Sequence, residues 1–296
     1  MGGLFRNLSS MLFGTALILG AAEASAFCRS TTCTGDCPRD DNGCKTTGHP
    51  LAWPGVCVGF SLQKDGTQNL PLADVRAAIE QAVATWSEID CGNGMATIAF
   101  ADVGDVSCHF AEYESGGPNA NVILFQDDKW RYHGPDDTLA KTTVTFDTDT
   151  GAILDADIEV NHAYNEFTLG DDHVVYDLES VITHELGHFI GLDHTPDLYA
   201  TMYAAYEEGS LDQRSLEVDD IEGLCAIYPP ERSGKCDPQP ENGLADACVQ
   251  EHTDDGSSGG GGGCALAASP AGAAGGFPFI VVGLFLHARR RRRTRV

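Results

Sequence analysis

An eleven-residue motif, HELGHFIGLDH, occupies positions 184–194 of this chain and sets the geometry around it. His184 and His188 are four residues apart, so on an α-helix both imidazoles project from one face, one turn above the other. Gly191 allows the chain to leave that helix through a backbone conformation that a side chain resists. The turn that follows can return His194 to the same point. The motif therefore predicts a helix, a tight exit turn and three converging imidazoles.

Three imidazoles at this spacing form the ligand set of a catalytic zinc ion, because three protein ligands leave a fourth position for water. Zinc lowers the pKa of its bound water to about 7 and polarises a scissile carbonyl. Glu185 lies beside the first ligand, where it can act as general base and pass the water proton to the leaving amine. A helix with two surface histidines is the alternative for the short pattern. The extended pattern, with Gly191 and His194 in register, argues against that alternative. We expect one zinc ion on His184, His188 and His194.

With these residues the chain resembles the metzincin metalloproteases, and among them the matrixins. Metzincins have a methionine turn after the zinc helix, and ATMYAAY at 200–206 is similar to it, with Met202 under the metal. Matrixins usually have proline after the Met-Tyr pair, whereas this chain has Ala204, a departure that would loosen the turn. Residues 216–228 are similar to the last helix of matrixin catalytic domains. For Met202 alone, ordinary core packing is the alternative.

The resemblance covers roughly residues 56–230 and implies a metzincin-like catalytic domain. Its fold class is α/β (α+β): a twisted, mixed, mostly parallel sheet with one antiparallel edge strand, two backing helices and a small C-terminal subdomain with a last helix. The apolar periodicity of the chain agrees with this order of elements. Helices are expected at 72–89, 178–190 and 218–227, and strands at 56–62, 96–100, 121–125, 142–146 and 153–160.

The resemblance also implies where a protein or peptide substrate would bind. It would run extended along the edge strand near 142–146, adding a strand through main-chain hydrogen bonds. The residue after the cut would enter a pocket between the zinc helix and the loop at 203–208. Thr142, Val144 and Tyr203 are the candidate substrate-binding residues.

The expected function is therefore zinc-dependent endopeptidase activity. The alternative is a non-catalytic zinc-binding surface adhesin or binding protein, since a fold alone does not establish a function. The intact Glu185 argues against it, because a binding module does not need that carboxylate. The formal net charge of −26 argues against nucleic acid as a partner. The oligomeric state is not specified by any motif, and a monomer is expected.

The sequence raises the question of two further metal sites. Many matrixins hold a second, structural zinc with several histidines, but Lys141 stands at one such place, so we expect one zinc. Residues 147–151, DTDTG, are similar to the start of a calcium loop, and a hairpin turn explains them equally well. Asp155, Asp157 and Glu159 alternate along the next strand. They are either a solvated strand face or part of the same calcium site, so Ca²⁺ stays an open second metal.

The beginning of the chain predicts an exported protein. Residues 1–26 have the pattern of a signal peptide, with an apolar run and a small-residue cleavage site. Residues 27–55 follow as a Cys-rich segment, and the eleven cysteines of the chain point to disulfides in an oxidising compartment. The first five, up to Cys57, are an odd number. One must pair elsewhere, as a disulfide to the catalytic domain, or remain a free thiolate that blocks the zinc.

The end of the chain predicts attachment to a surface. After the catalytic domain (56–230) we expect a polar and Gly-rich linker at 231–263 and a sorting or transmembrane tail at 264–296. Residues 265–288 contain no Asp, Glu, Lys or Arg and are long enough to cross a bilayer as a helix. With Cys264 and the terminal arginines, the tail resembles the surface-sorting tails of myxobacteria. The expected location is the cell surface or outer membrane, or the medium after tail processing, and a simple tail anchor is the alternative.

Overall fold

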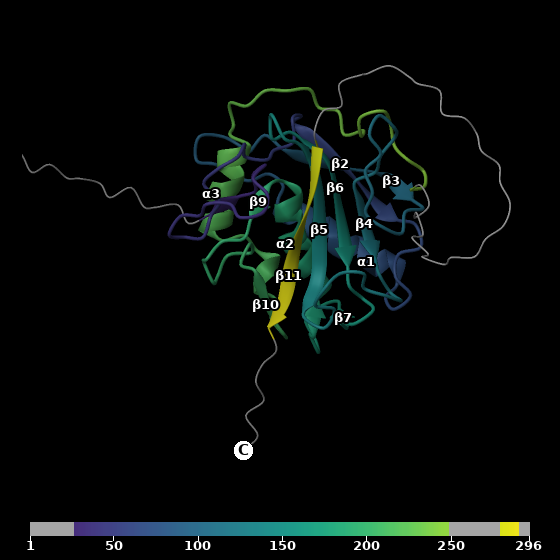
Figure 1. Cartoon of the computed structure of the whole chain (residues 1–296). Helices are drawn as coiled ribbons and strands as arrows, with labels where there is room; N and C mark the ends of the chain where they lie inside the picture. Colours follow the sequence, from purple (N-terminus) through teal and green to yellow (C-terminus); the bar gives the residue numbers. More distant parts are fainter. Residues whose placement is uncertain (1–26, 249–278, 290–296) are drawn as a thin grey trace, which may run out of the picture.

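The structure is a computed structural model that describes residues 27–248 and 279–289. A seven-stranded sheet runs through the described part in the order β10-β11-β5-β6-β4-β2-β3 (Figure 1). Strands β3, β2, β4 and β6 run parallel to one another, and β5 is antiparallel to β6. This confirms the mixed, mostly parallel α/β fold. The strands are Cys57–Gln63 (β2), Ala99–Val106 (β3), Val122–Phe125 (β4), Thr138–Asp147 (β5), Ile153–Val160 (β6), Ala205–Glu207 (β10) and Phe279–Arg289 (β11).

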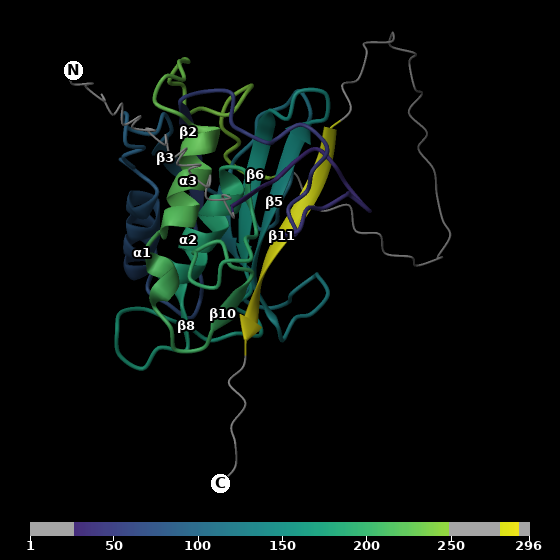
Figure 2. The ribbon, with the colours of Figure 1, turned by 90° about the vertical axis from the view of Figure 1, so that its left-hand side faces the viewer.

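Three α-helices lie on one side of this sheet (Figure 2). They are Leu72–Thr85 (α1), Leu178–Phe189 (α2) and Val218–Ile227 (α3). The buried positions of α1 recur at helical spacing and face α2 and the sheet, which explains why the periodicity predicted this helix. The helix ends at Thr85 rather than at 89, because Glu88 has a left-handed φ of 55°, which a continuing helix does not allow.

Short elements complete the described part of the chain. Two pairs of short strands lie outside the main sheet, and one 3₁₀ helix precedes α3. The short strands are Cys28–Arg29 (β1) with Leu192–Asp193 (β9), and Phe167–Thr168 (β7) with Tyr176–Asp177 (β8); the 3₁₀ helix is Asp212–Arg214.

Strand β3 begins and ends later than the predicted 96–100. Its second half carries exposed carboxylates, so its apolar pattern is weak in the sequence. The structure supplies partners for two of these carboxylates from a helix. Arg76 of α1 donates to Asp102 at 2.9 Å and to Asp105 at 2.6 Å. The extent of this outer strand follows its pairing with β2, and Arg76 links it to the helix.

Residues 279–289 form a β-strand, whereas the sequence predicted a membrane-crossing helix over 265–288. A short apolar run rich in Phe, Ile and Val is compatible with a strand or a buried helix, and periodicity alone does not distinguish them. Here the outer side of β5 offers free main-chain N–H and C=O groups, and β11 pairs with it in antiparallel register. Residues 249–278 and 290–296, like the predicted signal peptide, lie outside the described residues.

Within the described residues, no helix combines the length and the apolar character needed to cross a membrane.

Five disulfides pair all ten cysteines of the described chain. The fifth N-terminal cysteine, Cys57, pairs with Cys236, so the odd count resolves as a disulfide rather than as a free thiolate. Residues 231–248, expected as the beginning of a linker, are attached to the sheet by two of these bonds. The pairs are Cys28–Cys44, Cys33–Cys37, Cys57–Cys236, Cys91–Cys225 and Cys108–Cys248.

Candidate metal centre

Helix α2 carries the first part of the histidine motif and is almost entirely buried. It begins at an N-cap aspartate, Asp177, whose carboxylate accepts the backbone N–H of Ser180 at 2.9 Å and its hydroxyl at 2.8 Å. Arg214 donates two hydrogen bonds of 2.7 Å to the same carboxylate. The start of the helix is therefore held by a buried charge pair. The fixed start of α2 also fixes the positions of His184 and His188 along the helix, and both side chains are fully buried.

The chain leaves α2 through a glycine, as the motif predicts. Gly191 has φ +100°, and a Cβ at this position would lie 2.5 Å from the carbonyl oxygen of Leu51. Both the backbone angle and the close approach exclude a side chain. The following residues form β9, which pairs with β1 of the Cys-rich N-terminal segment. That pairing holds the turn that brings His194 back toward the helix.

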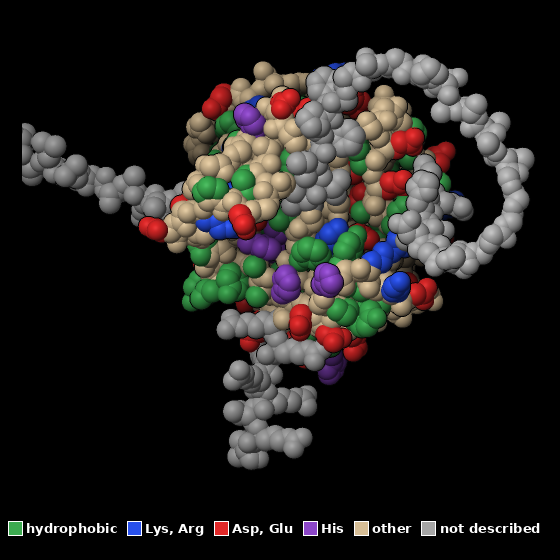
Figure 3. Space-filling view, viewed as in Figure 1, with side chains coloured by type: hydrophobic (Ala, Val, Ile, Leu, Met, Phe, Trp, Pro, Cys, Tyr) green, Lys and Arg blue, Asp and Glu red, His purple; other side chains and the backbone are tan. Residues whose placement is uncertain are grey.

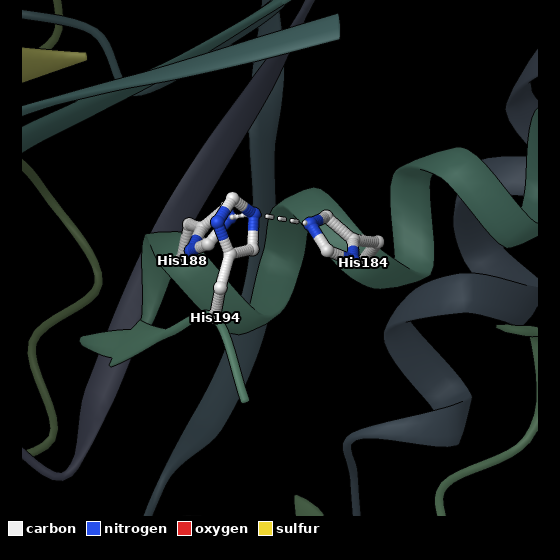
Figure 4. Close-up of side chains that lie close together, drawn as sticks. All are labelled: His184, His188 and His194. Atoms are coloured by element: carbon white, nitrogen blue, oxygen red, sulfur yellow. Dashed lines mark hydrogen bonds between the residues drawn. The ribbon is translucent and has the colours of Figure 1, made fainter. Parts of the chain in front are cut away.

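The three imidazoles converge on one point (Figure 4). The Nε2 atom of His194 lies 3.2 Å from Nε2 of His184 and 3.0 Å from Nε2 of His188. The opposite ring nitrogens are occupied, because Nδ1 of His184 donates to the Thr201 carbonyl at 2.6 Å and Nδ1 of His188 to the Leu192 carbonyl at 3.0 Å. With the protons on Nδ1, the Nε2 atoms of His184 and His188 present lone pairs toward His194.

This donor set fits zinc. Two nitrogens each about 2.05 Å from a tetrahedral zinc ion are about 3.3 Å apart, close to the observed separations. Lone pairs at this distance repel one another unless they share a cation. Burial lowers the pKa of all three histidines, to about 4 for His194, so the rings are neutral as metal ligation requires. Among the described residues, these histidines are the one group of three or more ligand side chains close enough to share an ion.

Glu185 is fully buried one residue after the first histidine. Its Oε2 accepts the hydroxyl of Thr142 from β5, and its Oε1 is buried without a hydrogen-bond partner among the described residues. Burial raises the pKa of Glu185 to about 8, while the Thr142 hydroxyl and the charge of Lys141 act in the opposite direction. A carboxylate with one free oxygen and a high pKa is suited to receiving and releasing a proton.

Met202 lies directly beneath the metal-binding helix. A Cβ on Gly187, between the two helical histidines, would lie 2.1 Å from the sulfur of Met202, so this glycine is what allows the close packing. The Met-turn backbone is anchored to α3, because the N–H groups of Thr201 and Met202 donate to the Asp220 carboxylate at 2.8 and 3.0 Å. Asp220 was not identified from the sequence. Its contacts hold the turn although Ala204 replaces the usual proline.

The three substrate-binding candidates occupy different environments. Thr142 is buried against Glu185. The side chain of Val144 is buried in the main core, and only its backbone is presented at the outer side of β5. Tyr203 is half-buried in the loop after Met202, where its carbonyl accepts the Gln213 side chain at 3.1 Å. The structure thus brings Thr142 to the metal centre and leaves a substrate role for all three as a proposal.

The acidic strand after the hairpin is not a solvated face. Asp155, Asp157 and Glu159 of β6 are 1 %, 1 % and 0 % exposed. The two oxygens of Asp157 accept the backbone N–H groups of Val122 and Glu112 at 2.9 and 3.0 Å. Asp157 is thus a structural acceptor in the interior.

The DTDTG segment forms the turn between β5 and β6. Oδ1 of Asp147 accepts the N–H groups of Asp149 and Thr150 at 3.0 and 2.8 Å, which closes the turn without a metal. The hairpin explanation therefore accounts for these residues, and calcium stays a prediction.

The paired acids predict a pH-dependent stability. Burial raises the pKa of Asp155 well above its usual value and that of Asp157 to about 8, and the two share a hydrogen bond. Because the folded-state pKa values are raised, the stabilisation is complete below about pH 4 and is lost as pH rises toward 8. In Asp155→Asn the amide donates at every pH, so the loss of unfolding free energy between pH 5 and 8 should shrink by at least about 1 kcal/mol. Urea unfolding at several pH values measures this, and parallel pH profiles for both proteins would contradict it.

Comparison with known proteins agrees with this geometry. The family model described as matrixin matches residues 52–229. Matrix metalloproteinase-C of Caenorhabditis elegans is 27% identical over 199 residues, which are 62% of this chain and 31% of the relative. Human neutrophil collagenase is 27% identical over 203 residues (66% of this chain, 38% of the relative), and human matrilysin 32% over 167 residues (55% and 53%). The chain thus spans about a third to a half of the length of these relatives.

Proposed function

The chain belongs to the matrixin family, and from that premise we propose that it is a zinc-dependent endopeptidase that hydrolyses peptide bonds in proteins. The observation that carries this proposal is the buried group of three converging Nε2 atoms beside the carboxylate of Glu185. A non-catalytic adhesin would require the histidines for a structural ion, but it would not require a buried carboxylate with a free oxygen next to them.

The residues of the chain have separate roles in this proposal. His184, His188 and His194 would hold the zinc ion, and the carbonyls of Thr201 and Leu192 orient the first two rings through Nδ1. When bound, zinc supplies Lewis acidity and a water molecule with a lowered pKa. Glu185 accepts a proton from the attacking water and delivers it to the nitrogen of the leaving peptide.

A substrate would bind as an additional strand on the outer side of β5, where Thr142 and Val144 present main-chain groups. The side chain after the cut would enter between α2 and the loop that contains Tyr203. Zinc is the metal of this proposal, and calcium stays a prediction. The five disulfides support an exported protein, in line with the predicted signal peptide. Anchoring through a sorting tail remains part of the proposal.

The proposed activity is tested on the purified full chain. We expect one zinc ion per chain by atomic emission spectroscopy and cleavage of casein at internal bonds. Removing the metal with a chelator should abolish cleavage, because the water is activated only when zinc is bound. Adding zinc should restore cleavage. Zinc bound at one per chain without any casein cleavage would support the adhesin alternative instead.

A further inference from the structure

The C-terminal strand β11 lies in the groove where a substrate strand would bind. It runs antiparallel to β5 on one side and parallel to β10 on the other, and it contacts α2 (Figure 1). In the face shown in Figure 3, histidine side chains gather beside hydrophobic side chains over this same region. The chain therefore supplies its own extended segment to the proposed substrate site.

The register of β11 is defined by main-chain contacts. Leu284 is paired with Thr142 and Leu286 with Ala140. After Leu286 the register shifts, and the N–H of His287 donates to the carbonyl of Ala204 at 3.3 Å. The segment thus passes from the edge of β5 to the loop that follows Met202. This is the path expected for a peptide that crosses the metal centre.

One side chain of β11 enters the interior at this point. Leu286 is 0 % exposed and belongs to the main hydrophobic core, together with Leu178 of α2 and Tyr206 of β10. Its neighbours do not enter the core, because Phe285 is half-buried with its ring 6.0 Å from that of Tyr132, and His287 is exposed. Leu286 thus occupies the place between α2 and the loop after Met202 that the residue following a cut would occupy.

The amide bond that precedes Leu286 lies at the catalytic carboxylate. The backbone N–H of Leu286 is within hydrogen-bonding reach of the Glu185 carboxylate. Thr142, whose hydroxyl donates to the same carboxylate, is paired with Leu284 of β11. The nitrogen of Leu286 is therefore in the position of the leaving amine.

We propose that β11 is bound as an intramolecular substrate and that the Phe285–Leu286 bond is a self-cleavage site, an inference that rests on the proposed endopeptidase function. One water molecule is consumed. Its oxygen bonds to the carbonyl carbon of Phe285 as the C–N bond breaks, leaving a carboxylate on Phe285. Glu185 transfers a water proton to the nitrogen of Leu286, which leaves as an amine.

The cut has two consequences that can be measured. It releases the eleven-residue peptide LHARRRRRTRV, residues 286–296, and with it six arginines. It also removes Leu286 from the groove, so the groove is closed to other substrates before the cut and open after it.

The experiment follows zinc addition to the purified, metal-free full chain by mass spectrometry. We expect a product that ends at Phe285 and a peptide that begins Leu-His-Ala-Arg, formed at a first-order rate that does not depend on protein concentration. Casein cleavage should appear with the same time course. Leu286→Met, which keeps the side-chain volume, should be cut, whereas Leu286→Asp should not, because a carboxylate is not tolerated in the apolar pocket.

A second measurement does not depend on activity. The measurement compares amide hydrogen exchange of residues 138–147 in two metal-free proteins, Glu185→Ala and the double variant Glu185→Ala, Leu286→Asp. Exchange should be at least about tenfold slower in the single variant, because β11 protects the outer side of β5 there. Equal exchange in the two would overturn the proposal. So would an intact C-terminus in a chain that cleaves casein, a result that leaves the endopeptidase function standing. If Leu286→Asp, with its groove open and zinc bound, also fails to cleave casein, the endopeptidase function itself fails.

Discussion

Replacing Glu185 with alanine is expected to lower kcat/KM for casein by about 10³-fold or more, with zinc content and fold unchanged. The reason is that Glu185 is fully buried beside His184 with one oxygen free of hydrogen bonds among the described residues, and a positioned general base contributes about 10²–10⁴-fold in rate. A 10³-fold loss corresponds to about 4 kcal/mol of transition-state stabilisation. The measurement is steady-state hydrolysis by the zinc-loaded variant, with zinc determined on the same sample.

The matched control is Glu80→Ala, which removes an exposed carboxylate from α1. It should leave kcat/KM unchanged, because Glu80 is far in the sequence from the motif and faces solvent. A Glu185→Ala protein with unchanged kcat/KM and full zinc occupancy would exclude the proposed role of this carboxylate. A variant that loses its zinc would instead point to a structural role for Glu185.

Replacing Asp177 with alanine is expected to lower the free energy of unfolding by about 3 kcal/mol. Asp177 is fully buried and has two functions at once: it caps α2 through Ser180 and accepts two 2.7 Å hydrogen bonds from Arg214. Loss of an N-cap costs about 1 kcal/mol, and loss of hydrogen bonds to a charged partner costs about 1.5–3 kcal/mol. Chemical denaturation with intact disulfides measures the change. The weakened start of α2 should also lower zinc affinity.

The control for this prediction is Asp171→Ala. Asp171 accepts a 2.9 Å hydrogen bond from the same arginine, but its side chain is 78% exposed. Because water competes for an exposed ion pair, this substitution should leave stability almost unchanged. If the two variants had the same free energy of unfolding, the burial of Asp177 would not explain its contribution to the stability of α2.

Local patterns predicted the elements whose geometry depends on near neighbours. The helix of the histidine motif, the glycine exit and the convergence of His194 follow from spacings of a few residues, and the strand at 153–160 has the predicted bounds. The last helix, predicted from its resemblance at 218–227, also begins and ends as expected. Boundaries were less predictable where a contact from elsewhere decides them, as the pairing with β2 does for β3.

Hydrogen-bond and disulfide partners that are distant in the sequence could not be predicted from local patterns. Asp220 holds the Met-turn from 18 residues away, and Cys57 pairs with a cysteine 179 residues later. The alternating acids of β6 have the pattern of a solvated face, yet Asp157 is buried because backbone N–H groups from other segments surround it.

The sequence by itself determined the histidine motif, the glutamate beside the first histidine and the family fold, because helical spacing and the freedom of glycine act over one or two turns. Only the tertiary structure decided which groups complete the site. The apolar run at 279–289 is compatible with helix or strand. It becomes a strand because the open side of β5, more than 130 residues earlier, offers hydrogen bonds and because Leu286 joins the main hydrophobic core. Such a choice depends on surfaces that exist after folding, so no local pattern specifies it.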